Sequence, residues 1–340
     1  MKIRIFCLVA IVISCLFTLK EVKAQDIHFS QYFASPLNLN PAMTGNFNGS
    51  FRVAGIYRNQ YFSVTRPYVT YGGSFDASLF RNQLNFDQMG VGLNVYSDVA
   101  GDGNLTTQSA TASFAYHKVL DEYNRHSISV GVQGGVVQKR VDVNSLIFES
   151  QIDADGNVNT GLPSGENFAN TSILYPDFNA GILWQSVISD RALGYGGFSL
   201  HHINQPEESF LENSDNRLEH RYVGHGGFDI RVGDYATIMP GFLIMMQSEA
   251  REISIGSALG YDLSGNSTVF FGAWHRLQDA IILYTGFEIS DLRVGFSYDI
   301  NTSDLRTASR GNGGLELSLI YIHGMEDRQS ITPVRFCPRF

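Results

Sequence analysis

Apolar and polar side chains alternate along most of this chain with a period of two residues. Between Tyr68 and Leu79, for instance, Val69, Tyr71 and Phe75 are separated by small or polar residues. Successive side chains of a β-strand point to opposite faces, so this pattern predicts strands with one apolar and one polar face. It recurs near residues 51–59, 68–79, 89–97, 105–118, 126–139, 175–186, 192–204, 219–232, 235–247, 252–263, 268–277, 279–289, 291–301 and 313–322.

The predicted strands have the length that a membrane-spanning strand needs. A tilted strand crosses a bilayer with about ten residues, and outer-membrane barrels close with an even number of antiparallel strands. We therefore predict an all-β fold, a transmembrane antiparallel β-barrel of about 14 strands. Pro240 falls within one segment and lacks a backbone donor, so we expect a β-bulge at that residue.

The connections between the predicted strands support a barrel independently. Counted from the first strand, the even-numbered connections are mostly short, as at Gly233–Asp234 and Ser290–Asp291. The odd-numbered ones include Arg140–Leu174, Gln205–Leu218 and Asn301–Asn312. Outer-membrane barrels have short periplasmic turns and longer external loops. An even number of strands places both ends on one side. We therefore expect a protein of the cell outer membrane with periplasmic termini and external long loops.

Charged side chains of both signs fall on the face opposite to the apolar one. A soluble sandwich of two sheets would expose them to bulk water, whereas a barrel would enclose them in its lumen. Because strand lengths and connections favour a barrel, we assign these side chains to the lumen. They are Arg52, Arg58, Asp76, Arg221, Asp229, Arg231, Glu252, Asp262, Arg276, Glu288, Arg293, Asp299 and Glu316.

The stretch Gln25–Gly45 precedes the first predicted strand and follows no regular period. Pro36 and Pro41 remove backbone donors and restrict the residues before them. An apolar, irregular segment needs surroundings that satisfy its backbone groups, and a barrel lumen would supply them. We predict that it plugs the barrel; a mobile N-terminus is the alternative. The candidate plug residues are Phe29, Tyr32, Asn40, Pro41 and Ala42.

The first residues have the features of a secretory signal peptide. Lys2 and Arg4 precede an apolar run, and a cleavage site follows at Ala24. A lipoprotein signal ending at Cys15 is the alternative, but the apolar run continues beyond that cysteine. The expected organisation is a signal peptide (1–24), a plug or hatch segment (25–50), an outer-membrane barrel (51–322) and a periplasmic C-terminal tail (323–340).

Charge and cysteine content exclude several classes of function. The chain has 24 basic and 33 acidic residues, and removal of four basic residues and Glu21 with the signal leaves a net charge of −12. An acidic chain has no basic patch with which to bind nucleic acid. Cys337 is the only cysteine after the signal, so a mature disulfide scaffold is excluded.

Candidate chemistry is sparse. The stretch Asp153–Asn159 has alternate oxygen side chains, but it lacks the glycine and glutamate positions of a calcium-binding loop. Four histidines have no further ligand at a spacing typical of metal sites. They are His201, His202, His220 and His225. We expect no metal, no cofactor and no enzymatic activity.

Short motifs stand at both ends of the mature chain. They are Gln25–Asp26, Phe29–Tyr32, Leu39–Ala42 with Gly45, Arg52–Ala54, Tyr57–Gln60 and Arg335–Phe340. These motifs resemble the PorP/SprF family of Bacteroidetes outer-membrane proteins, with Tyr61 standing where the family favours tryptophan. Asn40–Ala42 is also similar to the hatch of FadL-type fatty-acid transporters, another family of fourteen-stranded barrels.

The resemblance implies a component of the type IX secretion and gliding machinery. Such proteins help large surface adhesins with a C-terminal sorting domain to reach the cell surface or to stay there. In the periplasm they are associated with a peptidoglycan-binding OmpA-like lipoprotein. The implied partners are therefore an adhesin, this lipoprotein and outer-membrane lipid.

Two functions from different classes remain. In the first, the barrel is a platform whose lumen is closed by Gln25–Gly45. Its loops, chiefly Arg140–Leu174, hold a secreted protein, and its tail, Gly324–Phe340, faces periplasmic partners. In the second, the barrel is a transporter or porin for a small solute, such as a hydrophobic one, with the N-terminal segment as its gate. We favour the platform because a polar lumen of mixed charge offers no apolar ligand pocket.

Overall fold

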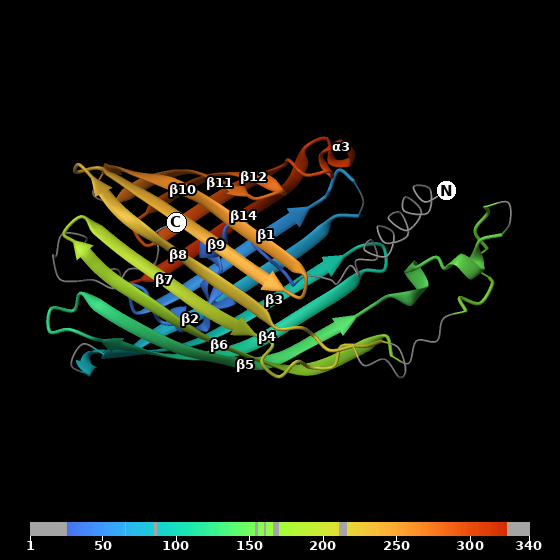
Figure 1. The fold of residues 1–340 in the computed structure, drawn as a ribbon, viewed down its shortest axis with the longest axis horizontal. Coiled ribbons are helices and arrows are strands. Elements are labelled where there is room, and N and C mark those ends of the chain that lie inside the picture. Colours follow the sequence, from blue (N-terminus) through green and yellow to red (C-terminus); the bar gives the residue numbers. More distant parts are fainter. Residues whose placement is uncertain are drawn as a thin grey trace, which may run out of the picture.

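The computed structural model describes residues 26–64, 66–84, 87–153, 156–159, 161–165, 170–210, 216–264 and 266–324. Within them, fourteen strands form one closed antiparallel barrel in which each strand pairs with the next along the chain (Figure 1). The strands are β1 (Phe51–Gln60), β2 (Tyr68–Leu84), β3 (Asp87–Ala100), β4 (Leu105–Val119), β5 (His126–Arg140), β6 (Ser172–Ser189), β7 (Ala192–His201), β8 (Arg221–Val232), β9 (Ala236–Gln247), β10 (Ala250–Ser264), β11 (Ser267–Arg276), β12 (Ala280–Ile289), β13 (Leu292–Asn301) and β14 (Asn312–His323). β1 and β14 close the circle, with Phe51 opposite His323. The predicted barrel is confirmed.

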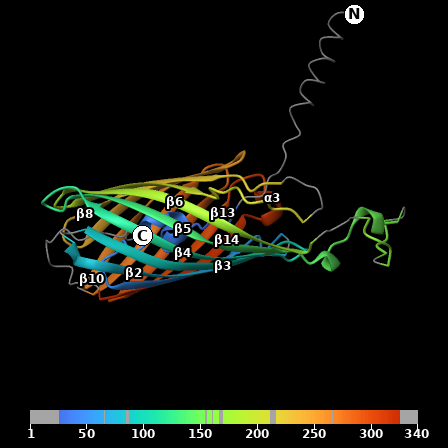
Figure 2. The same cartoon turned by 90° about the horizontal axis from the view of Figure 1, so that it is seen from below.

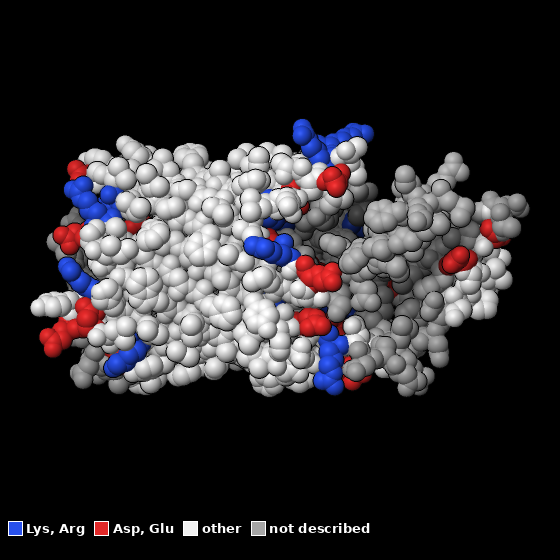
Figure 3. Space-filling model, viewed as in Figure 1, with Lys and Arg blue, Asp and Glu red and all other residues white. Residues whose placement is uncertain are grey.

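Alternation of side chains gives the barrel its two surfaces. In β12, Ala280, Ile282 and Tyr284 are buried toward the interior, whereas Ile281 and Leu283 are exposed on the outside. Figure 3 shows a broad band without charged side chains around the middle of the visible face, with charges toward its two ends. An apolar band between polar ends is the surface that a lipid bilayer covers. No helix among the described residues is long and apolar enough to cross a membrane.

The long connections all lie at one end of the barrel, the long-loop end, together with three short ones at residues 101–104, 248–249 and 277–279. The opposite, short-turn end carries the connections that follow β2, β4, β6, β8, β10 and β12. The long connections follow β1, β5, β7 and β13. Their described parts include the short helices η3 (Val143–Ser145), η4 (Glu149–Gln151) and α3 (Arg306–Ser309). In Figures 1 and 2 the described part of 141–171, drawn in green, projects beyond the strands along the barrel axis.

The predicted bulge at Pro240 is wrong. Toward β10, pairing runs without a shift, with Pro240 opposite Ser257. Toward β8, the pairs Gly227–Gly241 and Ile230–Ile238 share one register, and only the two pairs between them are missing. Proline lacks only its one backbone N–H donor. The strand tolerates this loss because its pairing with β8 is interrupted locally.

Residues 26–50, which we call the plug, lie inside the barrel, where Figures 1 and 2 show them in blue. They form η1 (Tyr32–Ala34), α2 (Pro36–Leu39) and η2 (Pro41–Met43). Pro36 and Pro41 each occupy an early helical position, where a missing N–H is tolerated. The Asn40 side chain caps η2 by accepting a hydrogen bond from Ala42 N at 2.9 Å.

The plug crosses the lumen from the long-loop end toward the short-turn end. Asp26 contacts His202, which directly follows β7 at the long-loop end. Ser50 N donates to His323 O at 2.8 Å, at the short-turn end. The expectation that both ends share one side therefore holds for the first and last strands but not for Asp26. The expected signal peptide (1–24) and residues 325–340 of the expected tail lie outside the described residues.

Candidate functional site

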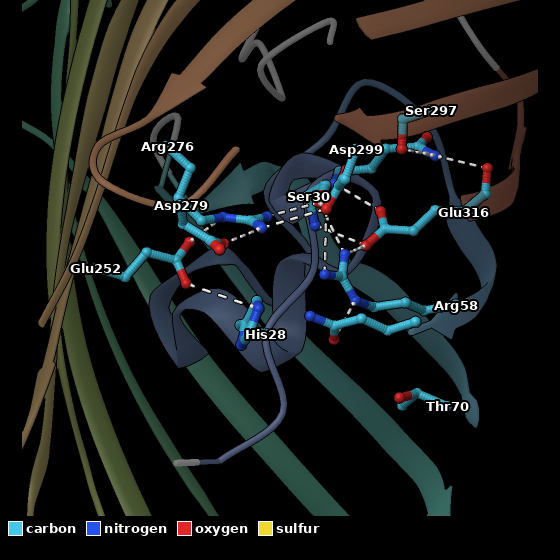
Figure 4. A network of polar contacts seen from close by, with 12 residues as sticks. His28, Ser30, Arg58, Thr70, Glu252, Arg276, Asp279, Ser297, Asp299 and Glu316 are labelled. Atoms are coloured by element: carbon cyan, nitrogen blue, oxygen red, sulfur yellow. Dashed lines mark hydrogen bonds and ion pairs between the residues drawn. The ribbon is translucent and has the colours of Figure 1, made fainter. Parts of the chain in front are cut away.

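Ser30 of the plug lies at the centre of a buried network of charged side chains from β1, β11 and β13 (Figure 4). Arg58 and Arg276 donate to Ser30 Oγ at 2.7 and 2.6 Å. The Ser30 hydroxyl in turn donates to Asp299 Oδ2 at 2.7 Å. Both guanidinium groups also lie 3.2 Å from that carboxylate oxygen. One plug hydroxyl thus links three charged side chains that come from separate strands.

Glu316 on β14 holds the main chain of the plug. Its two carboxylate oxygens accept hydrogen bonds from Ser30 N at 2.7 Å and Gln31 N at 2.8 Å, and it also pairs with Arg58. The Gln31 side chain extends the contact by donating to Ser297 Oγ at 3.1 Å. Removing one partner of such a buried, hydrogen-bonded pair costs about 3–5 kcal/mol. This part of the plug is therefore fixed in position.

Further acidic side chains balance the two arginines. Arg276 lies 3.2 Å from Glu252 Oε1 and 3.1 Å from Asp279 Oδ2. His28 Nε2 lies 3.9 Å from the other oxygen of Glu252. Burial lowers the pKa of His28 to about 4 against the pull of Glu252, and the nearby arginines add to the lowering. His28 is therefore neutral near pH 7, and the arginines supply the positive charge of the network.

A second ion pair holds the plug nearer the short-turn end. Arg52 and Asp76 form a bidentate pair, with Nε–Oδ1 at 2.9 Å and Nη2–Oδ2 at 2.7 Å. Arg52 also donates to Met43 O at 3.2 Å, and Asp76 accepts from Gly45 N at 2.8 Å. The guanidinium lies 4.8 Å from the centre of the Phe47 ring. Again the wall binds the main chain of the plug.

Neutral polar contacts hold the middle of the plug. Asn40 Nδ2 donates to Ile182 O at 2.9 Å, and Ser199 Oγ donates to Leu39 O at 2.7 Å. On the other side of η2, Thr44 O lies 2.9 Å from His117 Nε2. These partners come from β4, β6 and β7, which are far from the charged network in the strand order. The plug is therefore held from both sides of the lumen.

Glycines in the wall leave the space that the plug fills. A Cβ atom at Gly131 would overlap the backbone of Pro41 and Ala42. A Cβ atom at Gly90 would overlap Thr44 O, and one at Gly181 would overlap the Asn40 side chain. A strand glycine often marks a place where another stretch of backbone approaches closely. Here that stretch is the plug.

Asp26, His202, Asp177 and Arg221 form a polar cluster at the long-loop end, which we call the latch. It fixes the start of the plug. Asp26 pairs with His202, lies 3.5 Å from Arg221 and donates from its backbone N to Gln247 Oε1 at 3.1 Å. The other ring nitrogen of His202 lies 2.8 Å from Asp177 Oδ1. Burial alone would lower the pKa of His202, but the two carboxylates raise it to about 9. The imidazolium in turn holds the pKa of Asp26 well below its usual range, against the effect of burial.

A polar cavity of about 20 Å³ lies beside this latch. It is lined by Asn94, Gln133 and Arg221, among other polar residues. Asn94 Oδ1 and Arg221 Nε are buried without a hydrogen-bond partner. A cavity needs roughly 10–15 Å³ to hold one water molecule. This one has room for water but not for a metabolite.

Part of the lumen is apolar, contrary to the expectation of a wholly polar interior. Trp274 and Tyr284 point inward from β11 and β12, and Phe33 of the plug packs on both, with ring centroids 5.8 and 5.2 Å apart. Met239 and Ala258 complete the same buried cluster. The expectation failed because only charged residues were assigned to the inner face. This apolar area is buried, and Phe33 of the plug contributes to covering it.

The structure places the predicted residues as follows. All five predicted plug residues are buried in the lumen: Phe29, Tyr32, Asn40, Pro41 and Ala42. Eight predicted lumen charges are buried: Arg52, Arg58, Asp76, Asp229, Arg276, Glu288, Asp299 and Glu316. Four are partly buried: Arg221, Glu252, Asp262 and Arg293. Arg231 is exposed near the end of β8 rather than enclosed, because the strand extends past the filled part of the barrel.

Sequence reasoning missed Ser30, Gln31, the Asp26–His202 contact and the wall glycines that leave space for the plug. Gln31 contacts side chains more than 260 positions away, so no local pattern could reveal it. The pair His201–His202 was noticed only as a candidate metal site. Within the described residues, no group of three or more His, Cys, Asp or Glu side chains is placed to hold a metal ion. His202 instead binds two carboxylates.

The fold and its filled lumen define an outer-membrane β-barrel protein with an internal N-terminal plug. The family model of the type IX secretion system membrane protein PorP/SprF matches residues 21–321, and the chain belongs to this family. None of the curated proteins matches it.

Solved structures show a similar fold. The toluene transporter TodX of Pseudomonas putida has a TM-score of 0.50 and 11% identity, with 87% of this chain and 93% of that chain covered. The toluene transporter TbuX of Ralstonia pickettii has a TM-score of 0.49 and 9% identity, with coverage of 85% and 93%. A FadL homologue of Pseudomonas aeruginosa has a TM-score of 0.45 and 11% identity, with coverage of 83% and 92%.

Proposed function

We propose that this protein is a non-enzymatic platform of the type IX secretion machinery, which helps to secrete or anchor a large surface adhesin through the adhesin's C-terminal sorting domain. Membership of the PorP/SprF family supports a role in type IX secretion. The observation that carries the choice of a platform is the plug, which the wall holds by its main chain at Ser30, Gln31 and Gly45. A barrel filled in this way presents surfaces at its two ends rather than a path through its centre.

A transporter would need a path past the plug. The cavity beside the latch has room only for water, and Phe33 packs on Trp274 and Tyr284 in the apolar area. Opening the lumen would require the plug to leave Glu316 and Asp76, and each break would leave a buried charge with fewer partners. The transporter hypothesis therefore requires a large rearrangement, whereas the platform requires none.

The two ends of the barrel suit two kinds of partner. Because outer-membrane barrels direct their long loops outward, we place the long-loop end outside the cell, where a secreted adhesin would be held. The short-turn end then faces the periplasm, where the OmpA-like peptidoglycan-binding lipoprotein would meet the end of β14. In this arrangement Asp26 lies toward the outer mouth although the first strand begins at the periplasmic side.

Purification of the tagged protein from its native outer membrane tests this proposal. We expect a large secreted protein with a C-terminal sorting domain to co-purify, together with a periplasmic lipoprotein, and both to be identified by mass spectrometry. An unrelated outer-membrane barrel carrying the same tag is the control. Recovery of neither partner under conditions that keep the membrane complexes intact would overturn the platform.

A further inference from the structure

The described part of residues 141–165, which we call the arm, has its own internal order. Gln151 organises it: its Nε2 donates to Leu162 O at 3.0 Å, and its Oε1 accepts from Phe148 N at 3.1 Å. Ile152 and Val158 form an antiparallel bridge. At the base, Asp142 N donates to Gly103 O at 2.9 Å, which joins the arm to the connection between β3 and β4. The arm is therefore an ordered element of the structure.

The arm exposes aliphatic side chains. Ile147, Ile152, Val158 and Leu162 are 57%, 45%, 50% and 43% exposed. Figures 1 and 2 show that the arm extends beyond the ends of the strands, away from the apolar band of the barrel. Lipid that surrounds the strands therefore does not cover these side chains. Ile152 and Val158 lie opposite each other in the bridge and therefore share one face. Adjoining exposed apolar side chains of this kind mark an interaction site.

The charge of the arm restricts what can cover it. Asp142, Glu149 and Asp153 lie on it, and no Lys or Arg occurs between Val141 and Thr171. On the face shown in Figure 3, acidic but no basic side chains are visible on the arm. Phosphate groups of lipid would be repelled, and so would the arm of a second copy. The charge of the arm instead favours a cationic protein surface.

We propose that the arm is the docking site for the secreted protein, and that the docked domain presents an apolar groove flanked by Lys and Arg. This proposal rests on the proposed function and adds the residues and the chemistry of the contact. The four aliphatic side chains enter the groove, and Glu149 pairs with its basic rim. Burial of the aliphatic groups supplies affinity, while the charges speed association and select the partner.

The test compares arm variants with matched variants at the short-turn end. The apolar pair is Ile152→Ser with Val158→Ser, and its control is Leu120→Ser. The charge variant is Glu149→Lys, and its control is Glu122→Lys. Leu120 and Glu122 are exposed in the turn 120–125, far from the arm. Each variant is purified from native outer membranes, and the secreted protein identified with the wild type is quantified at low and high salt.

We expect each arm variant to recover at least tenfold less of the secreted protein, and both controls to recover the wild-type amount. The charge variant should be rescued by a secreted protein in which Glu replaces the basic rim residues. Heat-modifiable mobility on gels shows that every barrel is folded. If both arm variants retain the partner, the docking site is wrong and the platform stands. If the wild type itself recovers no secreted protein, the platform fails as well.

Discussion

The plug and the arm are both irregular segments with aliphatic side chains, but their surroundings differ. Leu37 of the plug is 0% exposed, whereas Ile152 of the arm is 45% exposed. Glu316 and Asp76 of the wall bind the backbone of the plug, while hydrogen bonds within the arm, such as those of Gln151 and Ser150, order the arm. Apolar content therefore does not decide whether a segment is packed. A wall with matching carboxylates and glycines makes one segment part of the barrel and leaves the other free for a partner.

The largest expected effect comes from the charged network around the plug. Glu316→Gln keeps the size of the side chain but removes the charge that faces Arg58. We expect the barrel to lose about 3–5 kcal/mol of stability, because a buried pair is broken on one side. Glu249→Gln in the exposed turn after β9 is the control and should change stability by less than about 0.5 kcal/mol. Denaturant unfolding in lipid vesicles measures both, and equal effects would contradict the assignment.

Truncation of one aliphatic residue in each segment compares them directly. Leu37→Ala should cost about 2–5 kcal/mol, because it leaves a cavity in the packed lumen. Ile152→Ala should cost less than about 0.5 kcal/mol, because the side chain is exposed and has little packing to lose. The same unfolding measurement applies. A large loss at Ile152, or none at Leu37, would show that the two segments are not held as described.

The latch at Asp26 predicts a pH dependence at the start of the plug. The pKa of His202 is raised to about 9, so its stabilising effect is complete below pH 6.5 and is lost as the pH rises through 9. The expected loss is about 3 kcal/mol, from about 1.4 kcal/mol per pKa unit. On the acid side, protonation of His28 and of Asp26 both weaken docking, because burial or pairing lowers the pKa of each group.

Hydrogen exchange of the amides that follow Asp26 measures this effect, after correction for the intrinsic pH dependence. Protection should fall between pH 6.5 and 9.5 in the wild type and stay level in His202→Gln. The amides of residues 40–44, which are held by other contacts, serve as the internal reference. A similar fall in protection in both proteins would exclude His202 as the cause.

Substitution of a wall glycine that leaves space for the plug should cause the smallest of these losses of stability. Gly131→Ala places a methyl group against the backbone of Pro41 and should cost about 1–3 kcal/mol, as overpacking does. Gly196→Ala is the matched control, since a Cβ there meets nothing within 4 Å. The melting temperatures of the two variants measure this difference in stability. If Gly131→Ala is as stable as Gly196→Ala, the wall does not hold the plug at this point.

Most of the fold could be predicted from the sequence, because strand alternation is a local pattern. The segment predicted at 279–289 became β12 at Ala280–Ile289, and the segment at 291–301 became β13 at Leu292–Asn301. The bulge predicted at Pro240 was wrong because the effect of a proline depends on which neighbouring strand its missing donor would have faced. That orientation is fixed only when the barrel closes.

The candidate site could be predicted only in part. The two prolines and the irregular apolar pattern indicated a segment that needed a container. The partners of that segment could not be derived, since Arg58 and Arg276 meet at Ser30 although their strands are remote in the sequence. The apolar inner area at Trp274 was missed because charged residues alone were assigned to the lumen. Such contacts depend on the curvature of the closed sheet and on the path of the plug through it.

Solute flux through the reconstituted protein tests the central claim that the plug is a fixed part of the barrel. Liposomes containing the wild type should be as impermeable to a small neutral sugar as empty liposomes. A variant lacking residues 26–45, with heat-modifiable mobility showing that its barrel is folded, should be leaky. A leaky wild type, or an impermeable barrel after deletion, would contradict the account.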